Sequence, residues 1–395
     1  MSSLVPGQTI GVLGGGQLGR MIILEGRKMG YRFVTLDPSE DAPGVQISDH
    51  HIKAGFDDIH AADQLASLSD LIIYEFENID PNVVRRIAEQ KNVPQGTKLL
   101  EVTRHRLMEK AAIEEAGVPV ASYAKVSSVE ELQQAIKKIG LPAVLKTVTG
   151  GYDGKGQWTF HTLEDVNQWL DQHHSMSQTY ILEKFIPFLK EISVVVARSV
   201  TGEIKAFPPA VNIHRNHILH LSIAPATIAE ATNKRAVQLA EQIAEHLQMV
   251  GLLAVEMFLH ADGHLYINEL APRPHNSGHY TYDACNPSQF EQMIRAVIGL
   301  PLITPTLYHQ AIMMNLLGEH QEAFFQTFSD LPPHIKPHWY GKTEAKTGRK
   351  MGHITLLTED ISRGLAELDQ LKICPALTAT EQTAIWTKEK GYTVD

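Results

Sequence analysis

The chain has 395 residues, 43% hydrophobic and 20% charged, a balance typical of a folded globular protein with two or three domains. Its net charge of -10 opposes attraction to nucleic-acid phosphates, and its two cysteines are too few for a disulfide framework. Because no stretch approaches the roughly 18 apolar residues of a membrane span and the N-terminus lacks a leader-like pattern, we expect a cytoplasmic protein that binds neither nucleic acid nor membrane.

The N-terminal part of the chain has a parallel α/β pattern. Residues 9–14 are predicted as a short buried strand, and the next fifteen have the apolar spacing of a helix. Strands predicted at 31–36 and 71–76 complete an alternation typical of a parallel sheet. We therefore expect a first domain at residues 1–102.

A dinucleotide-like motif follows the first strand. Residues 14–19 match G-x-G-x-x-G between a strand and a helix, and Asp37 lies about twenty residues further on. A nicotinamide-dependent dehydrogenase is therefore an alternative. The motif itself requires only an anion at a helix N-terminus, so a sugar phosphate fits as well.

A second domain, of α+β type, is expected at residues 103–300, and the proline-rich remainder is expected to form a small third domain at 301–395. In the second domain we predict helices at 103–116, 128–139 and 232–248, strands at 143–146, 180–185 and 191–197, and a polar stretch before the last helix.

A glycine-rich loop at residues 150–157 follows the strand that carries Lys146. Its glycines let backbone amides approach phosphate oxygens, which favours a flap over nucleotide phosphates; a snorkelling lysine and a flexible hairpin tip are the alternatives. Glu183 and Glu191 flank the next turn, where nucleotide contacts and surface glutamates are equally good interpretations. His214 is expected as a phosphate or nucleotide contact, because its spacing from the next histidines suits no zinc site.

Two strand-like runs flank Asp262 and Gly263, a dipeptide that favours a two-residue hairpin turn. That loop would place Glu256 opposite Glu269 with Cβ atoms roughly 5 Å apart, whereas a loop one residue longer would break the pairing. Repulsion between the two carboxylates calls for a divalent cation such as magnesium; two solvent-facing glutamates are the alternative. A twist or bulge would turn the amide oxygen of Asn268 toward the same ion.

The segment after this hairpin, residues 269–279, is rich in donors suited to a small oxyanion such as bicarbonate. A basic cluster in the 341–350 loop suits a substrate phosphate, with a solvated basic loop as the alternative.

These motifs together resemble the 5-(carboxyamino)imidazole ribonucleotide synthases of purine biosynthesis, which have the ATP-grasp fold. The resemblance spans nearly the whole chain and is most specific at Ala-Pro-Arg-Pro-His-Asn-Ser-Gly-His-Tyr-Thr, residues 271–281. It implies an N-terminal Rossmann-like parallel-sheet domain, an ATP-grasp domain with a lid at about 112–182, and a small C-terminal domain.

The resemblance also implies a reaction. ATP phosphorylates bicarbonate to carboxyphosphate, which delivers its carboxyl group to the amine of aminoimidazole ribonucleotide, while Glu256 and Glu269 hold magnesium. A homodimer is implied as well. Alternatives are an ATP-grasp ligase for another phosphoribosyl amine, such as formate-dependent glycinamide ribonucleotide transformylase, the dehydrogenase and a non-catalytic nucleotide sensor.

The site residues that the resemblance implies fall into three groups. Those expected to contact ATP are Arg106, Lys146, Gly151, Tyr152, Asp153, Gly154, Lys155, Gly156, Gln157, Glu183, Lys184, Phe185, Ile186, Glu191, His214, Asn268 and Glu269. Those expected to contact the ribonucleotide or bicarbonate are Gly16, Gln17, Leu18, Glu75, Tyr152, Arg273, His275, Asn276, Lys342, Lys346 and Arg349. Those expected to be catalytic are Asp153, as acceptor of the amine proton, Arg273, His275 and Lys342.

One departure concerns Arg106. The family more often has an amide or acidic residue where His105 stands, which leaves the choice between Arg104 and Arg106 as the nucleotide contact open. Leu107 and Lys110 align Arg106 with the family pattern.

Overall fold

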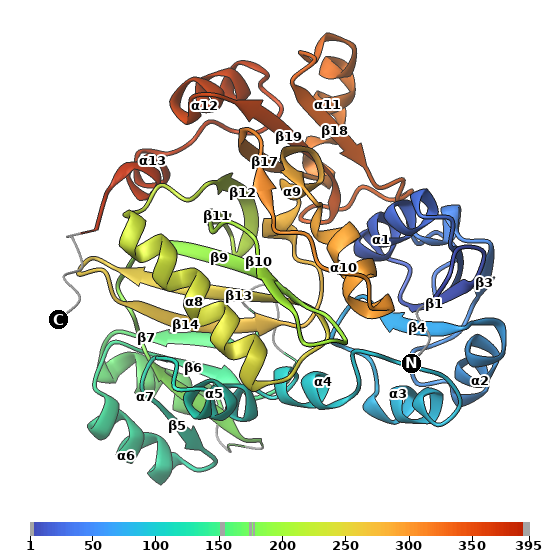
Figure 1. Cartoon of the computed structure of the whole chain (residues 1–395). Helices are drawn as coiled ribbons and strands as arrows, with labels where there is room; N and C mark the ends of the chain where they lie inside the picture. The colour runs from blue at the N-terminus through green and yellow to red at the C-terminus, as the bar shows by residue number, and fades with distance from the viewer. Residues whose placement is uncertain (1–3, 151–154, 174–175, 177, 390–395) are drawn as a thin grey trace.

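The computed structural model describes residues 4–150, 155–173, 176 and 178–389. In Figure 1 the N-terminal domain packs beside one end of a large central sheet, a smaller lid lies against that sheet, and the C-terminal elements extend it. No helix among the described residues is long and apolar enough to cross a membrane.

The N-terminal domain is built on a parallel sheet with the strand order β3-β2-β1-β4. Its central strands are almost wholly buried because helices cover both faces, as the predicted parallel α/β pattern requires. The parallel sheet is thus confirmed, although the short edge strand β3 was not predicted. The elements are β1 (Thr9–Leu13), α1 (Gln17–Lys28), β2 (Arg32–Leu36), η1 (Val45–Ile47), β3 (His50–Ile52), α2 (Ile59–Leu68), β4 (Leu71–Tyr74) and α3 (Pro81–Ala88).

Two helices lead from this domain into the lid, whose antiparallel sheet has the strand order β5-β8-β6-β7. Two further helices pack on one face of the sheet around Trp169 and Leu182. The connecting helices are α4 (Lys98–Thr103) and α5 (Arg106–Glu115); the lid comprises β5 (Tyr123–Val126), α6 (Val129–Ile139), β6 (Ala143–Thr147), β7 (Gln157–Phe160), α7 (Leu163–Gln172) and β8 (Tyr180–Lys184).

The central sheet has the strand order β14-β13-β9-β11-β12-β17-β19-β18, with β10 paired to β9. Alternate residues of β9 face opposite cores: Val194 packs with helix α8, and Val195 with helix α10 and the N-terminal domain. The elements up to residue 300 are β9 (Phe188–Arg198), β10 (Ile204–Ala206), β11 (Ala210–Arg215), β12 (Ile218–Ala224), α8 (Glu230–His246), β13 (Gly251–His260), β14 (Leu265–Ala271), η2 (Asn276–Gly278), α9 (Thr281–Ala284), β15 (Cys285–Asn286) and α10 (Gln289–Ile298).

The remainder of the chain adds three strands to this same sheet, because β12 pairs with β17. Strands β11 and β12 lie in the stretch predicted only as polar, so local patterns did not reveal this connection. The last elements are β16 (Thr306–Leu307), β17 (Gln310–Leu317), η3 (Gly318–His320), α11 (Gln321–Thr327), η4 (Phe328–Asp330), β18 (Ile335–Trp339), β19 (Lys350–Thr358), α12 (Ile361–Gln370) and α13 (Ala379–Trp386).

Candidate active site

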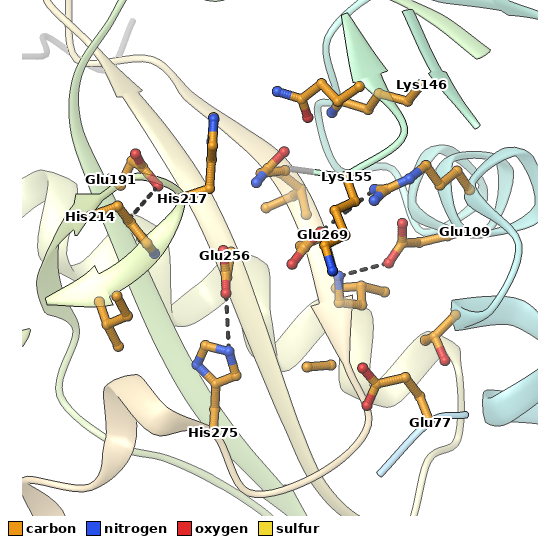
Figure 2. A pocket seen from close by; sticks show the side chains of 18 of the residues that line it. Glu77, Glu109, Lys146, Lys155, Glu191, His214, His217, Glu256, Glu269 and His275 are labelled. Carbon is orange, nitrogen blue, oxygen red and sulfur yellow. Dashed lines mark hydrogen bonds and ion pairs between the residues drawn. The ribbon is translucent and has the colours of Figure 1, made fainter. Parts of the chain in front are cut away.

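A cavity of about 1220 Å³ is lined by the N-terminal domain, the lid and the central sheet together. Its floor carries the hairpin of β13 and β14, and charged side chains converge on it from several elements (Figure 2). Most of the sequence-predicted site residues lie on its wall.

Glu256 and Glu269 are cross-strand neighbours in this hairpin, so the predicted pairing of the strands is confirmed. The predicted two-residue loop is wrong. The amide of His260 donates to the carbonyl of His264 at 2.9 Å, which leaves a three-residue loop, and in that loop only Gly263 has a positive φ, of 90°. The register is restored by a bulge, because Asn268 has no partner on β13 between the pairs made by Ile267 and Glu269.

Helix α5 holds the bulge from outside the hairpin. Lys110 donates to the carbonyls of Asn268 at 2.7 Å and Ile267 at 3.3 Å, and Glu109 accepts the amide hydrogen of Leu270 at 2.7 Å. A bulge interrupts the ladder and frees backbone groups, so these two buried side chains supply the missing partners. Burial raises the pKa of Glu109 to about 7.

The two facing glutamates have different electrostatic surroundings. Burial opposes ionisation of Glu256, but a hydrogen bond from His275, with Nε2 3.0 Å from the carboxylate, holds the pKa of Glu256 well below its usual range. Burial and the charge of Glu256 raise the pKa of Glu269, and Arg106, 3.6 Å away, opposes that rise. Both carboxylates line the cavity together with the bulged Asn268, and a set of hard oxygen donors like this suits magnesium. Among the described residues, no three histidine, cysteine, aspartate or glutamate side chains gather as a metal-binding group.

A buried ion cluster occupies the lid side of the cavity. Lys146 Nζ lies 3.0 Å and Lys110 Nζ 3.7 Å from Oε2 of Glu183. Burial alone would raise the pKa of this carboxyl group, but the two ammonium groups lower the pKa of Glu183 to about 2. Its other oxygen, Oε1, is buried without a hydrogen-bond donor among the described residues. An amine or hydroxyl of a bound nucleotide would satisfy that acceptor.

His214 and Glu191 form a second pair, 3.1 Å apart, on adjacent strands (Figure 2). Burial opposes charging of the imidazole, but Glu191 raises the pKa of His214 above its ordinary value. The hairpin turn that follows has positive φ at Asn216 (49°) and His217 (63°), and both residues line the cavity. His220 is not among the residues that line the cavity, and burial lowers its pKa to about 3. His214, His217 and His220 therefore do not meet at one site.

The dinucleotide-like loop is occupied by the protein's own carboxylates. Glu75 accepts hydrogen bonds from the amides of Gly16 and Gly19 at the start of α1, and burial raises the pKa of Glu75 to about 7. Asp37 accepts the amide hydrogens of Gly15 and Ser39, each at 2.8 Å. The acidic residue that would bind a dinucleotide ribose is therefore engaged by backbone, which disfavours the dehydrogenase alternative.

Arg273 connects the central sheet to the N-terminal domain. Its Nε and Nη2 atoms lie 2.5 and 3.3 Å from the two carboxylate oxygens of Glu77. Burial opposes the charge of each partner, yet the pair raises the pKa of Arg273 and lowers the pKa of Glu77. Arg273 and His275 both line the cavity, and His275 lies beside Glu256.

The basic segment 341–350 packs against the N-terminal domain, where Thr343 donates to Asp41 and Gln46 donates to the carbonyl of Gly341. Burial, together with the charges of neighbouring cationic side chains, lowers the pKa of Lys342 to about 8, and its ammonium donates to the Lys350 carbonyl at 2.7 Å. Lys346 pairs with Glu344 in an exposed position, and Arg349 donates to the Glu344 carbonyl.

The predicted residues divide into three groups by position. Those on the cavity wall are Gly16, Gln17, Leu18, Glu75, Arg106, Lys146, Lys155, Gln157, Glu183, Lys184, Phe185, Ile186, Glu191, His214, Glu256, Asn268, Glu269, Arg273, His275 and Asn276. Those described but off the wall are Gly156, Lys342, Lys346 and Arg349. Those outside the described residues are Gly151, Tyr152, Asp153 and Gly154.

Both arginines whose roles were open, Arg104 and Arg106, line the cavity, but Arg104 donates to the carbonyl of Ile79 while Arg106 lies by Glu269. Sequence reasoning missed several wall residues, because isolated charged or aromatic positions carry no motif. These are Glu77, Glu109, Lys110, His217 and Phe258.

Three family models match successive parts of the chain. They describe a ribonucleotide synthetase preATP-grasp domain at residues 7–104, an ATP-grasp domain at 111–290 and a phosphoribosylaminoimidazole carboxylase C-terminal domain at 311–367.

Individual proteins resemble the chain over almost its full length. The N5-carboxyaminoimidazole ribonucleotide synthase of Bacillus subtilis is 47% identical over 92% of this chain and 95% of its own length. That of Staphylococcus saprophyticus is 39% identical over 92% of this chain and 96% of its own length. A solved ADP complex of an N5-carboxyaminoimidazole ribonucleotide synthetase superposes with a TM-score of 0.91 at 48% identity, covering 94% of this chain and 98% of the other. The Aspergillus clavatus enzyme in complex with ADP and 5-aminoimidazole ribonucleotide superposes with a TM-score of 0.85 at 28% identity. The match covers 92% of this chain and 97% of the other.

Proposed function

The chain belongs to the N5-carboxyaminoimidazole ribonucleotide synthases, and from that premise we propose how its cavity carries out the ATP-dependent carboxylation of aminoimidazole ribonucleotide. The family places the enzyme in purine biosynthesis as a ligase of the ATP-grasp fold. The proposal concerns the carboxyl donor, the metal and the role of each residue. It rests above all on the facing pair Glu256 and Glu269 in a cavity that also contains Lys146 and Arg273.

The lid side of the cavity would bind ATP. Lys146 provides a cation for the phosphates, and the unsatisfied oxygen of Glu183 accepts from the base or ribose. Glu191 and His214 provide a further carboxylate acceptor and an imidazole at the central sheet. A solved relative with a TM-score of 0.91 is an ADP complex, which supports a nucleotide as a ligand of this chain.

Magnesium fits the next part of the cavity. Glu256, Glu269 and the bulged Asn268 would supply hard oxygen ligands, and phosphate oxygens and water would complete the shell. When bound, the ion would neutralise charge on the phosphates of ATP. Without a cation, burial and the charge of Glu256 already raise the pKa of Glu269, which indicates how unfavourable two bare carboxylates are here.

We propose bicarbonate as the carboxyl donor, beside Arg273 and His275. An oxygen of bicarbonate attacks the γ-phosphorus of ATP, the bond to the bridging oxygen of ADP breaks, and carboxyphosphate forms. The amine of aminoimidazole ribonucleotide then attacks the carboxyl carbon, phosphate leaves, and the amine gives up a proton, for which Asp153 is the proposed acceptor. Arg273, shared with Glu77, offers a guanidinium to the oxyanions on this route.

The ribonucleotide would lie between the N-terminal domain and the basic segment. Gln17, Leu18 and Glu75 line the cavity on the side of the N-terminal domain, and Lys342 and Arg349 belong to the basic segment, off the cavity wall. Burial and the charges of Arg349 and Lys350 lower the pKa of Lys342 to about 8, a sign of unbalanced positive charge that a substrate phosphate would relieve. A homodimer and a cytoplasmic location are part of the same proposal, and the two free cysteines fit a reducing compartment.

Phosphate release tests this function. Purified protein with ATP, magnesium and bicarbonate is expected to release phosphate quickly only when aminoimidazole ribonucleotide is added, and isotopic carbon from labelled bicarbonate is expected in the product. Equal stimulation by glycinamide ribonucleotide would favour the related ligase instead. Phosphate release that does not depend on bicarbonate would exclude bicarbonate as the carboxyl donor.

A further inference from the structure

A line of buried polar side chains crosses the central sheet and ends at His275. It begins with Ser222 on β12, continues through Asn212 on β11 and Ser193 on β9, and reaches Ser277 in η2. All four side chains are at most 5% exposed. A sheet that buries polar groups in its core requires partners for them, and here these residues satisfy one another.

The distances along the line are those of ordinary hydrogen bonds. Ser222 Oγ lies 2.8 Å from Asn212 Oδ1, and Asn212 Nδ2 lies 2.9 Å from Ser193 Oγ. Ser193 Oγ lies 2.7 Å from Ser277 Oγ, which in turn lies 2.8 Å from Nδ1 of His275. Nε2 on the far side of the imidazole lies 3.0 Å from Glu256.

The line has a direction. The carbonyl oxygen of Asn212 can only accept, so Ser222 donates to it, and the Asn212 amide nitrogen donates to Ser193. The geometry makes the Ser193 hydroxyl the donor to Ser277 Oγ. The hydroxyl proton of Ser277 is then free to point at Nδ1 of His275, which must accept it.

A second contact also makes Nδ1 of His275 an acceptor, independently of where the hydroxyl protons lie. The backbone N–H of Ser277, which can only donate, points at Nδ1 of His275 with a nitrogen to nitrogen distance of 3.4 Å. A proton on Nδ1 would therefore meet the backbone N–H and leave the buried Ser277 hydroxyl without its acceptor. With Nδ1 as acceptor, the ring proton sits on Nε2 and is donated to Glu256.

We infer that the Ser222, Asn212, Ser193 and Ser277 line fixes His275 in the Nε2–H tautomer, as a hydrogen-bond donor toward Glu256. This inference rests on the proposed function, which it deepens by excluding His275 as the base of the resting enzyme. Ser277 and Ser193 are positioning residues that act through His275. Ser193 is also the cross-strand neighbour of Glu256, so one side chain ties the orientation of the imidazole to the strand that carries the carboxylate.

Nitrogen NMR of histidine-labelled, metal-free protein tests the tautomer directly. Spectra would be recorded at pH 8.5, about two units above the ordinary pKa of histidine, and the His275 signals assigned from their loss in His275→Asn. We expect Nε2 to carry the proton in the wild-type protein. A wild-type ring protonated at Nδ1 overturns the inference. This result does not depend on whether the enzyme carboxylates aminoimidazole ribonucleotide, so the tautomer and the proposed function can be contradicted separately.

Kinetics of the positioning residues provide the second test. Ser277→Ala is expected to lower kcat about tenfold to a hundredfold, with the KM for ATP near the wild-type value, because outer partners of active-site groups have effects of this size. Ser277→Thr, which keeps the hydroxyl, should restore most of the loss, and Ser67→Ala on the exposed face of α2 is the matched control. Ser193→Ala replaces Ser277→Ala if the latter does not fold. A folded alanine variant with wild-type kcat overturns the inference.

Discussion

Glu256 and Glu269 face each other because two irregularities of their hairpin cancel. The loop is one residue longer than the Asp262-Gly263 turn predicts, which would shift Glu256 off Glu269, and the bulge at Asn268 shifts the register back. A bulge also re-aims side chains, so Asn268 and Glu269 both line the cavity. The metal site proposed here thus depends on the bulge as much as on the two acidic residues.

Glu269→Gln tests the metal site. A neutral amide cannot match the charge of a carboxylate on magnesium, so we expect turnover to fall by about a hundredfold or more while the circular dichroism spectrum stays that of the wild type. The magnesium concentration for half-maximal activity should rise. Glu245→Gln, the same change at an exposed position of α8, is the control and should be neutral. Wild-type turnover in Glu269→Gln would exclude Glu269 as a ligand.

Lys110→Met tests the support of the bulge. Lys110 is buried, donates to two hairpin carbonyls and lies 3.7 Å from Glu183. Its loss removes one of the two ammonium groups beside that buried carboxylate, leaving Lys146, and takes the donor from both carbonyls. We expect a loss of about 3 to 5 kcal/mol in unfolding free energy, the range for breaking a buried ion pair. Calorimetry would measure it as a lower Tm.

The control for this variant is Lys234→Met, which removes a lysine paired with Glu230 on an exposed face of α8. Exposed pairs contribute about 0 to 1 kcal/mol. Equal Tm values for the two variants would show that Lys110 does not support the bulge.

Glu75→Gln tests the buried carboxyl at the start of α1. Its folded pKa of about 7 lies above the roughly 4.3 of an unfolded glutamate, so its favourable contribution is complete below pH 4.3 and is lost as the pH rises through 7. The glutamine variant lacks this titration. Urea unfolding at pH 5 and pH 8 should therefore show the stability of the variant, relative to wild type, improving at pH 8. A constant difference between the two pH values contradicts the raised pKa.

Arg215→Met tests how the C-terminal segment is held. Arg215 makes two contacts to Glu381, at 2.6 and 2.9 Å, and donates to the carbonyls of Pro375 and Ala376. We expect limited proteolysis to cut the segment around α13 faster in the variant, because these anchors are lost together. Arg363→Met, at an exposed position of α12, should be cut at the wild-type rate. Unchanged protection of the segment in Arg215→Met would assign its attachment to other contacts, such as that of Lys190 to the carbonyl of Ile385.

Local patterns were sufficient for much of the fold. The parallel strands around Leu13 and Ile73 are apolar throughout because helices cover both faces of their sheet, and that pattern is legible without coordinates. The lid helix predicted at 128–139 is confirmed and is capped by Ser128, whereas the second lid helix, capped by Thr162, was not predicted. By contrast, β11 and β12 mix polar and apolar residues, since Asn212 and Ser222 are buried as a hydrogen-bonded pair, and the sequence does not reveal that pairing.

The sequence by itself determined the family and the order of the strands and helices that it predicted, because strand periodicity and motif spacing are local properties. It paired Glu256 with Glu269 only through a loop that is one residue too short. Only the tertiary structure decided how that facing arises. Lys110 holds the bulge from a helix 158 residues away in the chain, Glu77 reaches Arg273 across 196 residues, and Ser193 reaches Ser277 across 84. Contacts between segments so far apart are set by packing and by the need to satisfy buried polar groups, and neither leaves a spacing in the sequence.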